Sequence, residues 1–95
     1  MKLYIDGDAF PNILKTILFR AIERLKVTTY VVANKRINLG NSIYINYIVV
    51  SAGPDEADNR IVEMVNEGDL VITSDIPLAD RVITKKAHAI DHRGR

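Results

Sequence analysis

The sequence contains no cysteine, which excludes disulfide bonds, thiolate chemistry and cysteine-ligated zinc. It has no apolar run long enough to span a bilayer. The first residues, Met1 to Asp6, do not place a long apolar stretch behind a basic end, so we expect no secretory signal and a cytoplasmic protein. The net charge is only +1, so any nucleic-acid binding must come from a local patch rather than from an overall field.

The length and composition are those of one small globular domain. A chain of 95 residues rarely divides into two cores, and 47% apolar with 26% charged residues is ordinary for a folded protein. No internal repeat, low-complexity stretch or linker interrupts the chain. We therefore expect a single domain over residues 1–95.

Strand-like and helix-like apolar patterns alternate along the chain. We predict strands at 3–5, 27–33, 43–50, 70–73 and 87–90, and helices at 11–25, at about 56–66 and from residue 77. The segment 43–50 is apolar on both alternating faces, which favours a mostly buried strand. Strands that alternate with helices predict βαβ units and a parallel sheet. The simplest arrangement is a Rossmann-like three-layer α/β sandwich with strand order 3-2-1-4-5.

Aspartates follow several of the predicted strands. Ligands of open α/β sheets bind at the carboxyl ends of the strands, where the strand order reverses. Crowded carboxylates need a compensating positive charge, and a hard cation with oxygen ligands, Mg²⁺ or Mn²⁺, provides one. Such a site could activate water and hold a phosphodiester. The aspartates at this edge are Asp6, Asp8, Asp55, Asp58 and Asp75.

Three of these aspartates also have a simpler interpretation, as helix N-caps. Asp8, Asp55 and Asp75 all stand where a helix N-cap is expected. The other acidic residues are expected to be solvated helix or turn residues: Glu63, Glu67, Asp69 and Asp80.

Basic residues reach the same edge of the predicted sheet. Lys35 and Arg36 follow the second strand, and Arg93 follows the last one. They could contact phosphates beside a metal-bound phosphodiester, although a solvated loop and a frayed tail explain them as well. His88 and His92 are expected to be structural rather than metal ligands.

Three segments resemble the YaiI/YqxD family of uncharacterised bacterial proteins. The segments are YIDGDAFP at 4–11, ADNRIV at 57–62 and GDLVITSDIPLA at 68–79, and Arg93-Gly94 resembles the family's closing R-G. Phe10 stands where the family usually has cysteine. Relatives of this kind usually continue past the R-G with further helices, which the 95 residues do not include.

The resemblance implies a PIN-like fold, because that family is regarded as PIN-like. PIN domains are nucleases that use an acidic cluster with Mg²⁺ or Mn²⁺ to cut RNA. The resemblance therefore implies a catalytic metal site and single-stranded RNA as a possible substrate. The residues that it assigns to this site are Asp6, Asp8, Asp58 and Asp75.

Two other functions remain open at this stage. Asp6-Gly7-Asp8 is similar to the opening D-x-D of haloacid-dehalogenase phosphatases, with Asp6 as nucleophile and Asp8 as general acid. Those enzymes need a lysine near the site, and Lys85 and Lys86 fall late in the third helix. The chain could instead be a non-catalytic nucleic-acid or protein-binding module.

The predicted strand order also suggests self-association. Right-handed crossovers place the first helix alone on one face of the sheet and the other two helices on the opposite face. Parallel sheets are normally covered on both faces. We expect apolar residues around Ile43, Ile45, Ile48 and Val50 to stay partly exposed, and a homodimer or higher oligomer to bury them.

Overall fold

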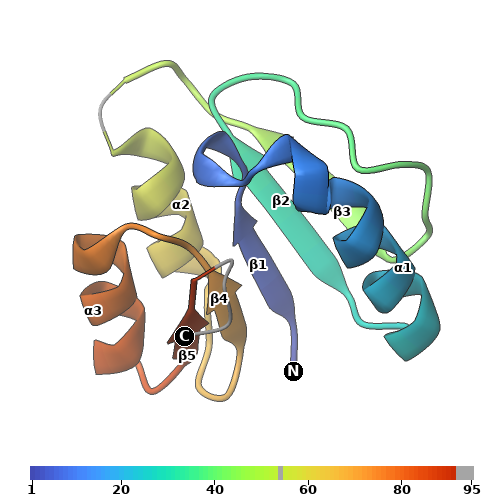
Figure 1. Cartoon of the computed structure of the whole chain (residues 1–95). Coiled ribbons are helices and arrows are strands. Elements are labelled where there is room, and N and C mark those ends of the chain that lie inside the picture. The colour runs from blue at the N-terminus through green and yellow to red at the C-terminus, as the bar shows by residue number, and fades with distance from the viewer. Residues whose placement is uncertain (54, 92–95) are drawn as a thin grey trace.

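A computed structural model describes residues 1–53 and 55–91 of the chain. It contains one sheet of five parallel strands in the order β3-β2-β1-β4-β5, which confirms the predicted order. The central strand is therefore the first one in the sequence (Figure 1). The strands are β1 (Leu3–Asp6), β2 (Thr29–Ala33), β3 (Ile45–Val49), β4 (Leu70–Ile72) and β5 (His88–Ile90).

Three α-helices, α1 (Lys15–Leu25), α2 (Glu56–Met64) and α3 (Ile76–Thr84), connect β1 to β2, β3 to β4 and β4 to β5, whereas the described residues 34–44 between β2 and β3 form no helix. The first α-helix begins later than predicted, because Pro11 is extended and two 3₁₀ turns, Gly7–Ala9 and Asn12–Leu14, precede it. The helix α1 ends where Lys26 turns into the left-handed conformation. None of the helices in the described part of the chain has the length and apolar character that a bilayer crossing requires.

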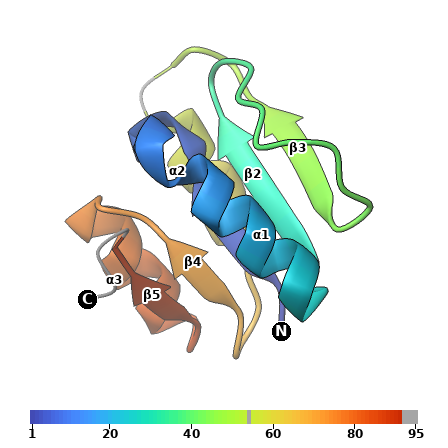
Figure 2. The ribbon, with the colours of Figure 1, turned by 45° about the vertical axis from the view of Figure 1, so that its right-hand side comes forward.

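The helices form two layers around the sheet. The helix α1 lies on one face, and α2 and α3 lie on the opposite face (Figures 1 and 2). Each face has its own apolar core. Ile22 of α1 packs with Ile5 and Val31 on the first face, and Ile61 of α2 and Leu78 of α3 pack on the second. The architecture is the predicted Rossmann-like sandwich.

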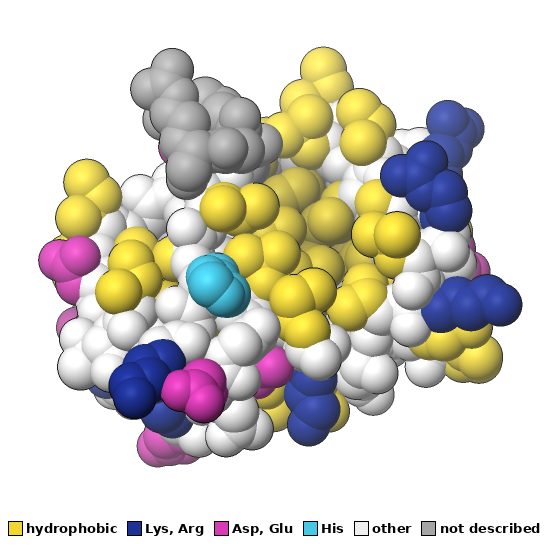
Figure 3. All heavy atoms as spheres, turned by 90° about the horizontal axis from the view of Figure 1, so that it is seen from below, with side chains coloured by type: hydrophobic (Ala, Val, Ile, Leu, Met, Phe, Trp, Pro, Cys, Tyr) yellow, Lys and Arg dark blue, Asp and Glu magenta, His cyan; other side chains and the backbone are white. Residues whose placement is uncertain are grey.

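The helix α1 leaves much of its face uncovered. Ile17 and Leu25 of α1 and Ile13 in the 3₁₀ turn before it, all of which the sequence pattern assigns to one apolar stripe, are each more than 60% exposed. An apolar groove lies between this helix and the sheet, and the view from below shows a hollow surrounded by hydrophobic side chains (Figure 3). The groove is lined by Phe10, Leu14, Ile17, Leu18, Ala21, Ile72, Ile90 and Asp91.

The expectation that segment 43–50 is mostly buried is wrong. The strand β3 is the edge strand beyond β2, and only Ile45 of its five residues is fully buried. Ile43 precedes the strand and is 90% exposed. Ile48 and Val50 are half-buried, but on the α2 side of the sheet, and Ile45 is buried, so the expectation that these residues leave an exposed patch beside the first helix is wrong. An apolar run indicates a strand, but its position in the sheet decides how much of it is covered.

The expectation of a solvated Asp69 is also wrong. This side chain is buried, and its two oxygens accept hydrogen bonds from the backbone N–H groups of Lys2 and Asn66, both at 2.9 Å. It ties the start of β1 to the turn before β4. Buried carboxylates are stable where such donors replace the lost water.

Candidate functional site

The carboxyl ends of β1, β2 and β4 meet at one edge of the sheet, on either side of the point where the chain reverses its direction across the sheet. Open α/β sheets place their ligands at such a point. A pocket of about 280 Å³ lies there. It is lined by all five predicted aspartates, Asp6, Asp8, Asp55, Asp58 and Asp75, together with Asn34, Gly53, Glu56 and Ala57. We call it the acidic pocket.

Asp6 is the deepest carboxylate in the acidic pocket. It is the last residue of β1 and only 7% exposed. Its Oδ2 accepts a hydrogen bond of 2.9 Å from the hydroxyl of Thr73. Burial raises the pKa of Asp6, the Thr73 hydrogen bond lowers it, and the nearby charges of Asp8 and Asp75 raise it further. The negative charge of Asp6 is therefore only partly compensated by the protein.

Asp75 is held at the beginning of α3. Its Oδ1 accepts a hydrogen bond of 3.0 Å from the backbone N–H of Leu78, so the interpretation of Asp75 as a helix N-cap is confirmed. The backbone N–H of Asp75 donates to the Thr73 hydroxyl at 3.0 Å. Thr73 thus fixes Asp6 and the loop that carries Asp75 in one arrangement. Capping engages one carboxylate oxygen of Asp75 and does not prevent the other from binding a ligand.

Asp55 occupies the predicted N-cap position of α2 but makes no capping hydrogen bond through its side chain, and the interpretation of Asp8 as a helix cap is wrong. Asp8 is exposed, and its Oδ2 accepts a hydrogen bond of 2.9 Å from the backbone N–H of Asn34, which joins the ends of β1 and β2. Asp55 adopts a left-handed conformation with φ of 63°, and only its backbone carbonyl enters the helix, as acceptor for the N–H of Asn59 at 2.8 Å. Both side chains are left to line the pocket.

Asp58 lies in the first turn of α2, on the pocket side. Burial raises its pKa to about 6, and the charges of Asp75, Asp6 and Asp55 raise it in the same direction, while Arg81 opposes them. A carboxylate with such a pKa is crowded by other carboxylates and has too little positive charge nearby.

The predicted phosphate-binding residues are less closely placed. Lys35 and Arg36 are exposed just after β2, and neither lines the acidic pocket, although the preceding residue, Asn34, does. Arg93 lies outside the described residues. The lysines considered for a phosphatase are at the other edge of the sheet, where α3 ends. Lys85 donates to the backbone carbonyl of Val62, and Lys86 pairs with Glu67 at 3.9 Å.

Sequence reasoning missed two residues of the site. Thr73 holds Asp6 and Asp75, and the backbone of Asn34 holds Asp8. The signal for Thr73 was its position two residues before Asp75, at the end of an apolar run. Asn34 carried no such signal, because its contribution is a backbone N–H.

The carboxylates of the acidic pocket are of the kind that bind a hard divalent cation. Within residues 1–53 and 55–91, no three or more histidine, aspartate or glutamate side chains are already grouped closely enough to hold a metal ion. Mg²⁺ does not require such a group, since it usually keeps several waters and is bound through one or two carboxylates. Carboxylates are also the ligands that Mg²⁺ and Mn²⁺ prefer. The poorly compensated charges of Asp6 and Asp58 are those that a cation would relieve.

Comparison with known proteins gives the family but no activity. Residues 4–95 match the sequence model of a family described as "Uncharacterized BCR, YaiI/YqxD family". Three curated relatives, each named UPF0178 protein, come from Sulfurimonas denitrificans, Sulfurovum sp. and Nitratiruptor sp. and are 67%, 64% and 63% identical over 94 residues. The matches cover 99% of this chain and 62%, 64% and 62% of those relatives, so the chain spans a little under two thirds of their length. No solved structure matches the chain significantly.

Proposed function

This chain belongs to the YaiI/YqxD family, and from that premise we propose that its acidic pocket binds Mg²⁺ or Mn²⁺ and hydrolyses phosphodiester bonds of single-stranded RNA. The observation that carries the proposal is the convergence of five aspartates from three separate segments on one pocket at the carboxyl edge of the sheet. The names of the family and of these relatives state no activity, so the proposal rests on this pocket and on the PIN-like resemblance of the sequence.

The aspartates have different parts in this proposal. One or two of Asp6, Asp8, Asp58 and Asp75 would bind the cation directly and the others through bound water, with Asp55 at the rim of the pocket. When bound, the cation would lower the pKa of a water molecule and neutralise charge on the phosphodiester. Asp6, Asp8 and Asp75 are already oriented, because they accept hydrogen bonds from Thr73, Asn34 and Leu78 respectively. Such preorganisation avoids the cost of ordering the ligands upon binding.

Positive charge for the RNA backbone would come from the loop after β2. Lys35 and Arg36 are exposed directly after Asn34, which lines the acidic pocket. Phosphate contacts of this kind position a nucleic acid without selecting its sequence. Arg93 is assigned the same role by its place in the sequence alone. Because the net charge of the chain is only +1, we expect weak, strongly salt-dependent binding.

The test is calorimetric titration of Mg²⁺ and Mn²⁺, together with cleavage of a fluorescently labelled single-stranded RNA. The Asp6→Asn variant should lose both activities, whereas Asp80→Asn, which removes an exposed charge from α3, should keep them. Equal residual cleavage by the wild type and Asp6→Asn would reveal a contaminant. Metal-dependent RNA binding without cleavage would leave the binding-module hypothesis, and phosphate release from an aryl phosphate alone would favour the phosphatase.

A further inference from the structure

A second crevice lies beside the acidic pocket, between α3 and β5. It has a volume of about 220 Å³ and shares Asp75 with the acidic pocket. The crevice therefore continues the same carboxyl edge of the sheet beyond β4. It is lined by Thr73, Ser74, Asp75, Ile76, Ala79, Ala89, Ile90 and Asp91.

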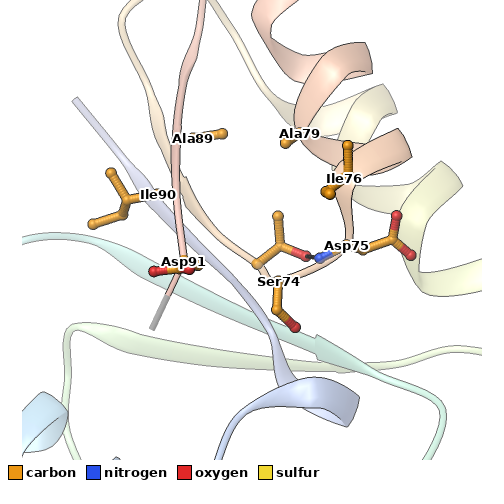
Figure 4. A pocket seen from close by; sticks show the side chains of 8 residues that line it. Ser74, Asp75, Ile76, Ala79, Ala89, Ile90 and Asp91 are labelled. Atoms are coloured by element: carbon orange, nitrogen blue, oxygen red, sulfur yellow. Dashed lines mark hydrogen bonds between the residues drawn. The ribbon is translucent and has the colours of Figure 1, made fainter. Parts of the chain in front are cut away.

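The crevice exists because small side chains face each other across it. In Figure 4 the methyl groups of Ala79 on α3 and Ala89 on β5 point toward one another, with Ile76 beside them, whereas the side chain of Ile90 points away. A larger residue at position 79 or 89 would fill this space. The polar groups of Ser74 and Asp75 lie lower in the view, next to the loop that leaves β4 (Figure 4).

We propose that this crevice holds the unpaired base of the nucleotide next to the phosphodiester bound at the acidic pocket. The inference rests on the proposed function, since it assigns a place to another part of the same substrate. Base and phosphate of one nucleotide are neighbours, as are the two hollows that share Asp75. The apolar walls suit the face of a base, and the Ser74 hydroxyl, which also lines the crevice, can accept a hydrogen bond from one of its N–H donors.

The chemistry of the crevice also indicates which nucleic acids it can take. A base that is paired and stacked in a duplex cannot enter a crevice between a helix and a strand, so the site selects single-stranded segments or ends. Within residues 1–53 and 55–91, no aromatic side chain lines the crevice. Nucleotides are therefore held by aliphatic contact rather than by aromatic stacking, which implies weak binding of a single nucleotide.

The test is a methyl NMR titration of the protein, labelled at alanine and isoleucine methyl groups, with the four uncharged ribonucleosides in EDTA. We expect shifts of the Ala79, Ala89 and Ile76 methyl signals. Ala89→Val should fill the crevice and weaken binding at least about fivefold. Ile76→Ala should weaken it too by removing a wall, and it should fold normally because Ile76 is 74% exposed. The matched control, Ala21→Val, makes the same change in the groove on the opposite face and should leave binding unchanged.

The outcomes separate this inference from the proposed function. The base site is overturned if the crevice methyl groups do not shift and Ala89→Val keeps the metal binding and RNA cleavage of the wild type. The hydrolytic function would then still stand. An Ala89→Val protein that is more stable but titrates like the wild type would show a packing gap and also overturn the site. If the wild type shows shifts of the crevice methyl signals that Ala89→Val abolishes, the base site is supported. If the same protein binds no divalent cation, the hydrolytic function is contradicted.

Discussion

Replacing Asp58 by asparagine should stabilise the cation-free protein at pH 7. The pKa of this carboxyl rises from 3.8 to about 6 upon folding, so the folded chain holds the proton more tightly than the unfolded chain. The stability that the proton provides is complete below about pH 4 and is lost as the pH rises through about 6. At pH 7 the wild type therefore carries the cost of a crowded charge that asparagine, with nearly the same shape, does not.

The size of this effect follows from the pKa and from the position of the residue. At 1.36 kcal/mol per pKa unit, the rise amounts to about 3 kcal/mol. Asp58 is only partly buried, and screening by solvent reduces the value to roughly 1–2 kcal/mol. Loss of a carboxylate from the first turn of α2 removes about 0.3–1 kcal/mol of favourable interaction with the helix dipole. The net gain is about 1 kcal/mol, or roughly 4–8 °C in Tm for a domain of this size.

Thermal unfolding followed by circular dichroism in EDTA measures this gain. The matched control is Glu56→Gln, which removes a negative charge from the same first turn but from an exposed side chain. It should lower Tm slightly at pH 7, because it removes a carboxylate that interacts favourably with the helix dipole. The advantage of Asp58→Asn should be largest at pH 7 and nearly absent at pH 4. A variant that is destabilised as much as Glu56→Gln, or stabilised equally at both pH values, would refute the assignment of a crowded charge to Asp58.

Two further predictions concern Asp75 and the uncovered face of α1. Asp75→Asn keeps an acceptor for the Leu78 N–H but removes the charge. Asp75→Ala also removes the helix cap, so its free energy of unfolding in urea should be about 1 kcal/mol lower than that of Asp75→Asn. Both variants should lose Mn²⁺ binding in calorimetry, and retained binding in either would contradict a ligand role. We also expect a homodimer or higher oligomer that buries the exposed side chains of Ile13, Ile17 and Leu25. Ile17→Glu should shift the sedimentation coefficient to that of the monomer, and a wild type that is monomeric at tens of micromolar would contradict this expectation.

The strand order and the gathering of the aspartates follow from local sequence patterns. Alternating strands and helices specify a parallel sheet, right-handed crossovers restrict its order, and a parallel sheet places every strand's carboxyl end at one edge. An acid that follows an apolar run, such as Asp6 or Asp75, must then lie at that edge. No contact between distant residues is needed for this inference.

The burial of individual residues could not be predicted in the same way. The exposure of β3 depends on which strand forms the edge, and its apolar sequence is the same in either position. The hydrogen bond between Thr73 and Asp6 joins residues 67 positions apart, and the one between Asn34 and Asp8 joins residues 26 apart. A single sequence contains no local pattern for such pairs, and the same holds for the backbone partners of Asp69.

The position of β1 in the middle of the sheet has a consequence for the order of folding. The first strand to be synthesised pairs with β2 on one side and with β4 on the other, so it waits for residues about 70 positions downstream before its second edge is satisfied. Contacts this distant in sequence form slowly, because the chain entropy of a long loop is lost first. Asp6 comes from the beginning of the chain and Asp75 from the residues after β4, so these two repelling charges of the acidic pocket come together only through contacts between residues about 70 positions apart.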